Sequence, residues 1–364
     1  MSKTTFATNI PSMDIESFMS TMIPMYQAFL KTERKLPAIM LWGAPGVGKS
    51  DAIKQIAKEL AETTKRTPHV TDVRLLLYNP VDLRGIPTAD ENKEFAKWLK
   101  PHIFDMNAGN EYINFLVLDE ITAAPQSVQA AAYQIVLDRQ IGEHKLPDNC
   151  VIIAAGNRIT DKSVAYSMPK ALCNRLTHIN IEPKQEAWKK WAIDAGIDAR
   201  IIGFLNFKPN TLFAFDPGSQ DQAYPTPRTW EMVDNYMKIN NKMDVIRPLI
   251  EGTIGVGATA EFVAFCKTYG ELPEIKDIVD GKYTKYPSQP DVCFALQAAI
   301  VNYFLNNKLS EQQLKNLITY TNGMQAEFAI LTVKDLIGSK EFRKKVNKIP
   351  EWDSFVEKYI NFVI

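Results

Sequence analysis

Apolar residues in the first half of the chain form short continuous runs, separated by segments in which they recur at helical spacing. Continuous runs of this length are typical of strands that a parallel sheet buries on both faces. They predict strands at residues 37–42, 69–78, 113–118, 150–157 and 177–181. Segments with helical spacing lie at residues 15–26, 50–60 and 127–137. The alternation predicts an α/β domain whose parallel sheet is flanked by helices.

From residue 183 onward the pattern changes to helices joined by long loops. Pro227 stands at a helix start, and Ser310–Gln313 has the form of a capping box. Further helical segments lie at residues 291–305, 328–337 and 352–363. The pattern therefore predicts that an all-helical region follows the sheet domain.

The loop between the first predicted strand and its helix has the form G-x-x-x-x-G-K-S. Glycines allow backbone N–H groups to turn inward around an anion, and the following helix directs its N-terminus at the same place. In such loops the lysine, here Lys49, reaches the β- and γ-phosphates, and the serine, here Ser50, ligates Mg²⁺. The predicted nucleotide-binding residues are Gly43, Ala44, Pro45, Gly46, Val47, Gly48, Lys49 and Ser50.

Polar side chains follow two other predicted strands. The run ending at Leu118 is followed by Asp119 and Glu120, the strand-tip acid pair of P-loop ATPases. We expect Asp119 to hold Mg²⁺ together with Ser50, and Glu120 to orient and deprotonate the attacking water. Asn157 ends a later strand, where its amide either positions that water or serves ordinary turn chemistry.

Three arginines are candidates for contact with phosphate. Arg175 is either a surface cation or an arginine finger acting on a neighbouring subunit, with Arg139 as the fallback for that role. Arg228 lies in the first turn of the helix opened by Pro227, where a cation opposes the helix dipole. That position suggests that Arg228 meets an anion.

Composition narrows the class of protein. The 364 residues carry 42 basic and 42 acidic side chains, a balance that argues against a dedicated nucleic-acid-binding surface. The four cysteines are widely spread and form no C-x-x-C pair, so neither a zinc site nor a disulfide framework is expected. The chain starts without an apolar signal core, and no apolar run is long enough to span a membrane. We expect a cytoplasmic protein.

These motifs together resemble the MoxR-like branch of the AAA+ ATPases, the helix-2-insert clade, in its bacterial and phage type. The resemblance rests on the loop Gly43–Ser50, the pair Asp119 and Glu120, Asn157 in the sensor-1 place and Pro227-Arg228 in the sensor-2 place. Residues 168–175, Met-Pro-Lys-Ala-Leu-Cys-Asn-Arg, are similar to the branch's block that ends in Asp-Arg-Phe, with Asn174 for its Asp. Two predicted hairpins, at residues 88–99 and 139–147, lie where this branch places its helix-2 insert and pre-sensor-1 hairpin.

The resemblance implies a P-loop AAA+ core, an all-helical lid and C-terminal helices. The expected division is an N-terminal lead-in and helix at 1–36, the nucleotide-binding core at 37–182, the lid with sensor 2 at 183–245 and a C-terminal helical region at 246–364. It also implies ATP and Mg²⁺ as cofactors and a ring, typically a hexamer. The implied partner is a protein, frequently one with a von Willebrand factor A-type domain.

Three functions remain open from the sequence. The favoured one is an ATP-hydrolysing ring motor that remodels or activates a protein partner in a chaperone-like way. The second is a motor acting on nucleic acid, since replicative helicases carry the same pair of hairpins. The first hairpin carries both acidic and basic residues, which argues against contact with nucleic acid. These residues are Asp90, Glu91, Lys93, Glu94 and Lys97. The third is a nucleotide-gated scaffold with slow turnover.

Overall fold

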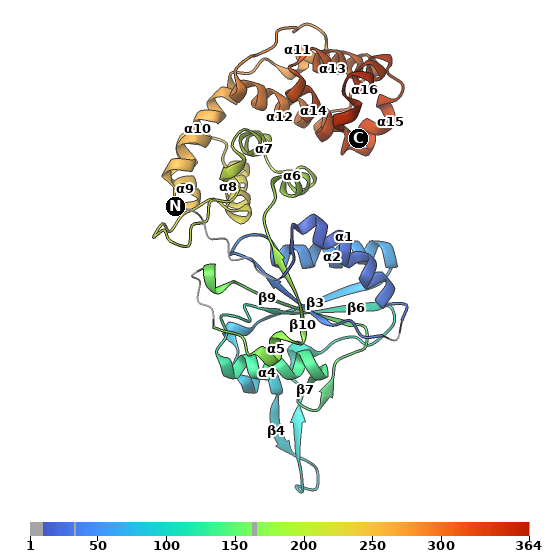
Figure 1. Ribbon diagram of the computed structural model, residues 1–364, viewed down its shortest axis with the longest axis vertical. Coiled ribbons are helices and arrows are strands. Elements are labelled where there is room, and N and C mark those ends of the chain that lie inside the picture. Colours follow the sequence, from blue (N-terminus) through green and yellow to red (C-terminus); the bar gives the residue numbers. More distant parts are fainter. Residues whose placement is uncertain (1–9, 33, 162–165, 364) are drawn as a thin grey trace. The chain divides into compact units, whose positions relative to one another are not determined.

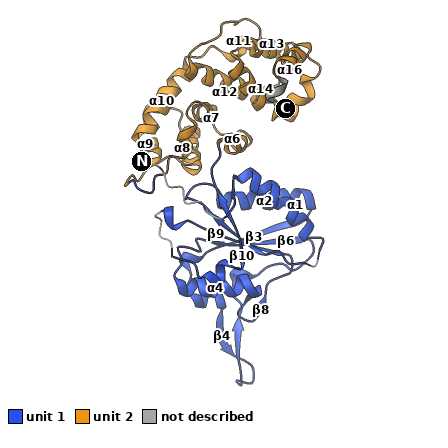
Figure 2. Cartoon of the chain, in the orientation of Figure 1, with its two compact units in different colours: residues 1–184, 216–219 blue, residues 185–215, 220–364 orange. Residues whose placement is uncertain are grey.

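The computed structural model describes residues 10–32, 34–161 and 166–363, with side chains up to Tyr359 (Figure 1). The chain separates into two compact units (Figure 2). The first comprises residues 1–184 and 216–219, and the second comprises residues 185–215 and 220–364. The predicted finer division of the helical part into a lid and a C-terminal region stays a prediction.

A six-stranded sheet forms the centre of the first unit. Its order is β1-β10-β2-β9-β6-β3, and every neighbouring pair is parallel. The strands are β1 (Ser12–Met13), β2 (Ala38–Trp42), β3 (Thr67–Arg74), β6 (Tyr112–Asp119), β9 (Cys150–Gly156) and β10 (Leu176–Ile181). The predicted parallel α/β fold is confirmed.

Helices cover both faces of this sheet. On one face lie α1 (Ile15–Phe29) and α2 (Lys49–Thr64), and on the other lie α4 (Gln126–Asp138) and α5 (Lys170–Cys173) (Figure 1). Alternate residues of each central strand face opposite sides: Met40 and Ile152 join the core under α4, whereas Ile39 and Ile153 are buried on the side of α1 and α2. This two-sided burial explains why the strands appear as unbroken apolar runs.

The first strand was not predicted from the sequence. Residues Ser12 and Met13 lie in a segment interpreted as a polar lead-in, yet they pair with Asn180 and Ile181 at the edge of the sheet. The predicted strand at 69–78 also differs, since β3 ends at Arg74 and the apolar residues 75–77 form a 3₁₀ turn. A two-residue strand is too short to produce a period, and apolar character alone does not distinguish a strand from a turn.

Two hairpins project from the α4 side of the chain. The first pairs β4 (Ile86–Ala89) with β5 (Ala96–Leu99), and the second pairs β7 (Gln140–Ile141) with β8 (His144–Lys145). The His144 Nε2 atom lies 2.8 Å from the Trp98 carbonyl oxygen, so the hairpins contact each other. The short helix α3 (Pro80–Arg84) precedes the first hairpin, and α4 precedes the second. Both predicted hairpins are present.

The second unit is helical throughout its regular structure. Its first helices are α6 (Gln185–Asp194), α7 (Ala199–Phe207), α8 (Pro227–Ile239), α9 (Met243–Ile254) and α10 (Val256–Gly270). Its later helices are α11 (Ile275–Val279), α12 (Pro290–Asn306), α13 (Glu311–Gly323), α14 (Ala326–Ile337), α15 (Lys340–Val346) and α16 (Pro350–Val363). One core gathers around Phe204, Trp230 and Phe262, and a second around Leu296, Phe342 and Phe355.

Sequence-derived caps explain where several of these helices begin. Ser310 accepts a hydrogen bond from the Gln313 N–H, and the Gln313 side chain accepts one from the Ser310 N–H, as the capping box predicts. Thr226 and Thr229 form the same reciprocal pair ahead of α8. Across the described part of the chain, none of the helices combines the length and the apolar character needed to cross a membrane.

Candidate nucleotide-binding site

The phosphate loop follows β2 and continues into the first turn of α2, which begins at Lys49. Two of its glycines have left-handed backbones, with φ of 78° at Gly46 and 92° at Gly48. Gly48 is the N-cap of α2, and a Cβ atom there would lie 2.7 Å from the Ile15 Cδ1 atom. The Ile15 side chain could move aside, but the left-handed φ would strain any other residue, so this backbone favours glycine at position 48.

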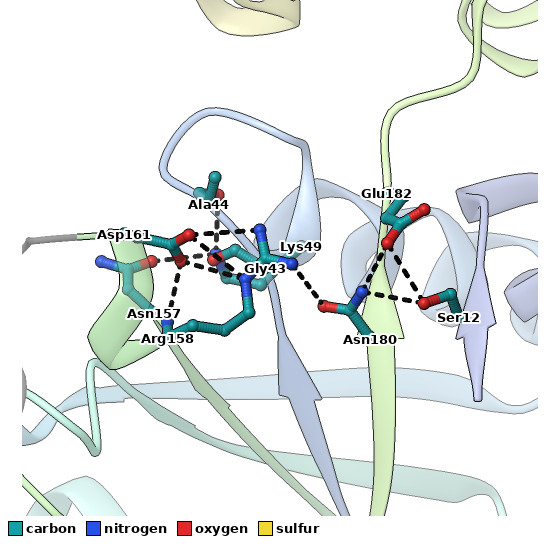
Figure 3. Close-up of polar contacts among 9 residues, drawn as sticks. All are labelled: Ser12, Gly43, Ala44, Lys49, Asn157, Arg158, Asp161, Asn180 and Glu182. Carbon is teal, nitrogen blue, oxygen red and sulfur yellow. Dashed lines mark hydrogen bonds and ion pairs between the residues drawn. The ribbon is translucent and has the colours of Figure 1, made fainter. Parts of the chain in front are cut away.

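Lys49 is 9 % exposed, and its ammonium group lies inside the loop. It donates to the carbonyl oxygens of Gly43 at 2.6 Å and Ala44 at 3.0 Å, and to the Asn157 Oδ1 atom at 3.2 Å (Figure 3). The sequence-predicted lysine and sensor asparagine are thus brought together from β2 and β9, adjacent strands whose ends pair at Trp42 and Gly156.

The predicted metal ligands also meet. The Ser50 hydroxyl donates to the Asp119 Oδ2 atom over 3.1 Å, so one hydroxyl and one carboxylate point into the same space. Two protein oxygen donors suit Mg²⁺, which keeps several waters and takes its remaining ligands from phosphates. The residues therefore fit the expected cofactor. Burial, and then the neighbouring Asp119 carboxylate, raise the pKa of Asp72 on β3, a third acidic group at this edge of the sheet.

Glu120 has an unusual backbone for its residue type. Its φ is 55°, the left-handed region that costs a non-glycine residue about 1–3 kcal/mol. The turn is held by hydrogen bonds on both sides: the Glu120 N–H donates to the Asp119 Oδ1 atom over 2.8 Å, and the Ala123 N–H donates to the Glu120 carbonyl over 2.9 Å. The left-handed backbone turns the predicted general base out of the line of the strand, directly after the predicted metal ligand Asp119.

A polar network continues from Asn157 toward β1 (Figure 3). Arg158 forms an ion pair with Asp161, with 3.2 Å between the NH2 nitrogen and Oδ1, and its NH1 group donates to the Asn180 Oδ1 atom over 3.3 Å. The Asn180 amide in turn donates to the Ser12 hydroxyl and to the Glu182 carboxylate, over 2.9 and 2.8 Å. This network joins the turn after β9 to β10 and to the edge strand.

Arg175, predicted as a finger, lies just after α5. Its guanidinium stands over the Tyr133 ring of α4, 4.9 Å from the ring centroid, and donates to the Ala171 carbonyl over 2.7 Å. Its role toward a neighbouring subunit stays a prediction. The fallback candidate Arg139 is 8 % exposed and donates to the Cys150 carbonyl inside the core. A side chain held in this way cannot reach another subunit, so the fallback is wrong.

Arg228 belongs to the second unit, in the first turn of α8, where its side chain is exposed. Its predicted contact with the γ-phosphate also stays a prediction. The sequence interpretation missed four buried or half-buried polar residues at the site, namely Thr122, Arg158, Asp161 and Asn180. Asn180 could have been found, because it is a polar residue within a strand that the pattern predicts to be buried and apolar.

Comparison with known proteins identifies this architecture. Residues 38–178 match the model of the ATPase family associated with various cellular activities (AAA). Chaperone MoxR1 of Mycobacterium tuberculosis is 28 % identical over 156 residues, which are 41 % of this chain and 38 % of that protein. A probable replication factor C subunit 5 of Caenorhabditis elegans is 25 % identical over 224 residues, 55 % of this chain and 57 % of that protein. The matches thus span 38 % and 57 % of the length of these two relatives.

Solved structures with a partial resemblance include a RuvB mutant of Thermotoga maritima, 15 % identical, with a TM-score of 0.40 over 88 % of this chain and 87 % of that one. The ORC2 protein of Aeropyrum pernix is 10 % identical, with a TM-score of 0.40 over 91 % and 88 % of the two chains. The family match and the MoxR1 relative agree with the motif residues that the site brings together. Residues 38–178 are therefore similar to the AAA ATPase family, and the MoxR1 relative supports a resemblance to its MoxR-like branch.

Proposed function

We propose that this protein binds ATP with Mg²⁺ and hydrolyses it. The observation that carries the proposal is the meeting of Lys49, Ser50, Asp119 and Asn157 in hydrogen-bonded contact at one edge of the sheet. The ammonium group supplies charge for the β- and γ-phosphates, and the hydroxyl and carboxylate supply the metal ligands. The ends of two strands, β6 and β9, and the phosphate loop have to converge for this contact, whereas a glycine-rich turn that matches the motif by chance would not bring them together.

Glu120 is the proposed general base. It follows Asp119 directly, and its backbone is fixed by the two hydrogen bonds of the turn. Ser50 and Asp119 would hold Mg²⁺, which would supply positive charge that stabilises the phosphate during transfer. Glu120 orients the attacking water and takes its proton, and the Asn157 amide, held from its oxygen by Lys49, fixes the position of that water.

The test is ATP turnover measured beside nucleotide affinity. Lys49→Ala should abolish binding, because the phosphates lose their principal cation. Glu120→Gln should retain binding and lower turnover by at least ~100-fold, the scale of a lost general base. Glu62→Gln, on an exposed carboxylate of α2, is the matched control and should leave both unchanged. Near-normal hydrolysis in Glu120→Gln would contradict the assignment of Glu120 as the general base.

We further propose that the chain works as a subunit of a ring, which is expected to be a hexamer, and that it remodels or activates a protein partner. A relative named as a chaperone supports the chaperone-like role. A partner with a von Willebrand factor A-type domain follows from the resemblance alone. Capture by a Glu120→Gln trap, compared with Lys49→Ala, tests this, since a partner of the motor should be retained only by the nucleotide-binding form.

A nucleic-acid motor is the second candidate, favoured by the relative named as a replication factor C subunit. The β4–β5 hairpin argues against it, because its tip mixes acidic and basic residues rather than presenting a basic surface. Binding to phosphates would weaken steeply with salt. Salt-dependent DNA binding, together with DNA-stimulated turnover, would favour this candidate over the protein-remodelling one.

A further inference from the structure

Thr122 lies two residues after Glu120, in the turn that leads from β6 to α4. Its side chain is 2 % exposed, and its hydroxyl oxygen accepts a hydrogen bond from the Asn157 N–H over 3.1 Å. The turn of the predicted general base is therefore hydrogen-bonded directly to the backbone of Asn157, the residue that follows β9. The two residues are 35 positions apart in the sequence, so the fold brings them into contact.

The surrounding backbone is built for this close approach. The Ile121 N–H donates to the Ala155 carbonyl over 3.0 Å, which continues the pairing of β6 with β9 beyond Glu120. A Cβ atom on Gly156 would lie 2.6 Å from the Thr122 hydroxyl oxygen, so only glycine leaves space for it. Tyr166 donates its N–H to the Thr122 carbonyl, which fixes the other side of the residue.

We propose that Thr122 is a positioning residue for ATP hydrolysis, and that its hydroxyl sets the spacing between Glu120 and Asn157. The inference rests on the proposed function, because it assigns Thr122 a role in that reaction. Both groups act on the same water, and each is placed by its backbone: Glu120 by a left-handed turn and Asn157 by the end of a strand. The hydroxyl is the side-chain contact that joins the two backbones.

A purely structural role for Thr122 makes a different prediction. If the side chain only fills space, Thr122→Val should keep the wild-type kcat, because valine has the same branched shape. If the hydroxyl matters, valine leaves the Asn157 N–H without its protein acceptor, and a polar group that loses its partner inside the protein is destabilising. The backbone then relieves this cost by shifting Asn157 away from Thr122. Serine keeps the hydroxyl and loses only a methyl group.

The experiment compares Thr122→Val and Thr122→Ser with the wild type and with Thr332→Val. Thr332 is a fully buried threonine in the second unit, so it controls for the same chemical change away from the site. We expect Thr122→Val to lower kcat by about 10- to 100-fold, the usual effect of misplacing a reacting group by about an ångström. Nucleotide affinity should stay unchanged, and Thr122→Ser should recover most of kcat. Hydrogen exchange of the Asn157 amide should be faster in Thr122→Val only.

Each result has a distinct meaning. Wild-type turnover that depends on Glu120, with Thr122→Val equal to wild type, overturns the role of Thr122 and leaves the proposed function intact. Equal losses in Thr122→Val and Thr122→Ser, or a loss confined to affinity, also overturn it. A wild type that binds ATP without hydrolysing it removes the proposed function, and this inference with it. Slower turnover with faster Asn157 exchange, rescued by serine, supports it.

Discussion

Replacing Asp161 with alanine should destabilise the first unit and slow hydrolysis at the same time. Asp161 lies three residues after Arg158, in a 3₁₀ turn, and its side chain is 5 % exposed. It accepts from the Arg158 N–H over 2.8 Å and from the Arg158 Nε atom over 3.2 Å. Alanine therefore removes both the ion pair and the hydrogen bond that holds the backbone beside Asn157 (Figure 3).

The size of the effect follows from burial. Removing one partner of a fully buried ion pair costs about 3–5 kcal/mol, because the other charge is left without compensation. The Arg158 side chain keeps 30 % exposure, and NH1 still donates to the Asn180 amide, so water and one protein acceptor offset part of the loss. We expect about 2–3 kcal/mol for Asp161→Ala, and less for Asp161→Asn, which retains an acceptor for the Arg158 N–H.

The assay is a double-mutant cycle in urea, with Arg158→Ala, Asp161→Ala and the double variant. A direct pair should show a coupling free energy of about 0.5–3 kcal/mol, with the double variant less destabilised than the sum of the two single changes. Lys54→Ala and Asp51→Ala form the matched control, because that ion pair is 3.7 Å long and exposed. Additive losses at residues 158 and 161 would refute the reasoning, as would coupling no larger than in the control pair.

Two further predictions concern the first helix and the ring. Asp14→Ala should cost about 1 kcal/mol at pH 7, since Asp14 caps α1 by accepting from the Ser17 N–H over 2.8 Å. Partial burial opposes ionisation, yet the Ser17 hydrogen bonds lower the pKa of Asp14 below 3.8, so urea titrations should show this stability above pH 3.8 and its loss as the pH falls through the folded-state value. Mixing Arg175→Ala subunits with Glu120→Gln subunits should restore part of the turnover if Arg175 acts in trans, because fingers contribute about 10³–10⁵ in rate. Mixed rings as inactive as their parents, or normal turnover in Arg175→Ala alone, would place the finger elsewhere.

Local chemistry explains which parts of the site the sequence predicted. The phosphate loop needs glycine at Gly48 for its backbone and a lysine next to it, so its requirements lie within eight consecutive residues. Asp119 was placed in the same way, by an apolar run that ends in charge. The hydrogen bond from Ser50 to Asp119 then follows from topology, because parallel strands bring their carboxyl ends to one edge.

The remaining contacts depend on register between distant segments. Ser12 joins Asn180 across 168 positions, through a two-residue strand that has no period of its own. Arg139 shows the opposite case, in which a motif position suggested a role that the fold does not allow. Its place at the start of the second hairpin made it the fallback candidate for the arginine finger, yet its side chain is buried and donates to the Cys150 carbonyl oxygen. Neither the direction of a side chain nor its burial follows from the motif that contains it.

A polar residue within an apolar strand predicts a specific contact inside the protein. Asn180 interrupts β10 and Asn114 interrupts β6, and both side chains are almost completely buried. Buried polar groups need hydrogen-bond partners, so each interruption predicts a contact. Position within the strand separates the two roles. Asn180 pairs in register with Trp42, next to the phosphate loop, and bonds to Arg158. Asn114 pairs with Cys150 at the amino end and bonds to the loop at Asn107. In a parallel sheet, an interruption near the carboxyl end therefore indicates the site, and one near the amino end indicates a structural contact.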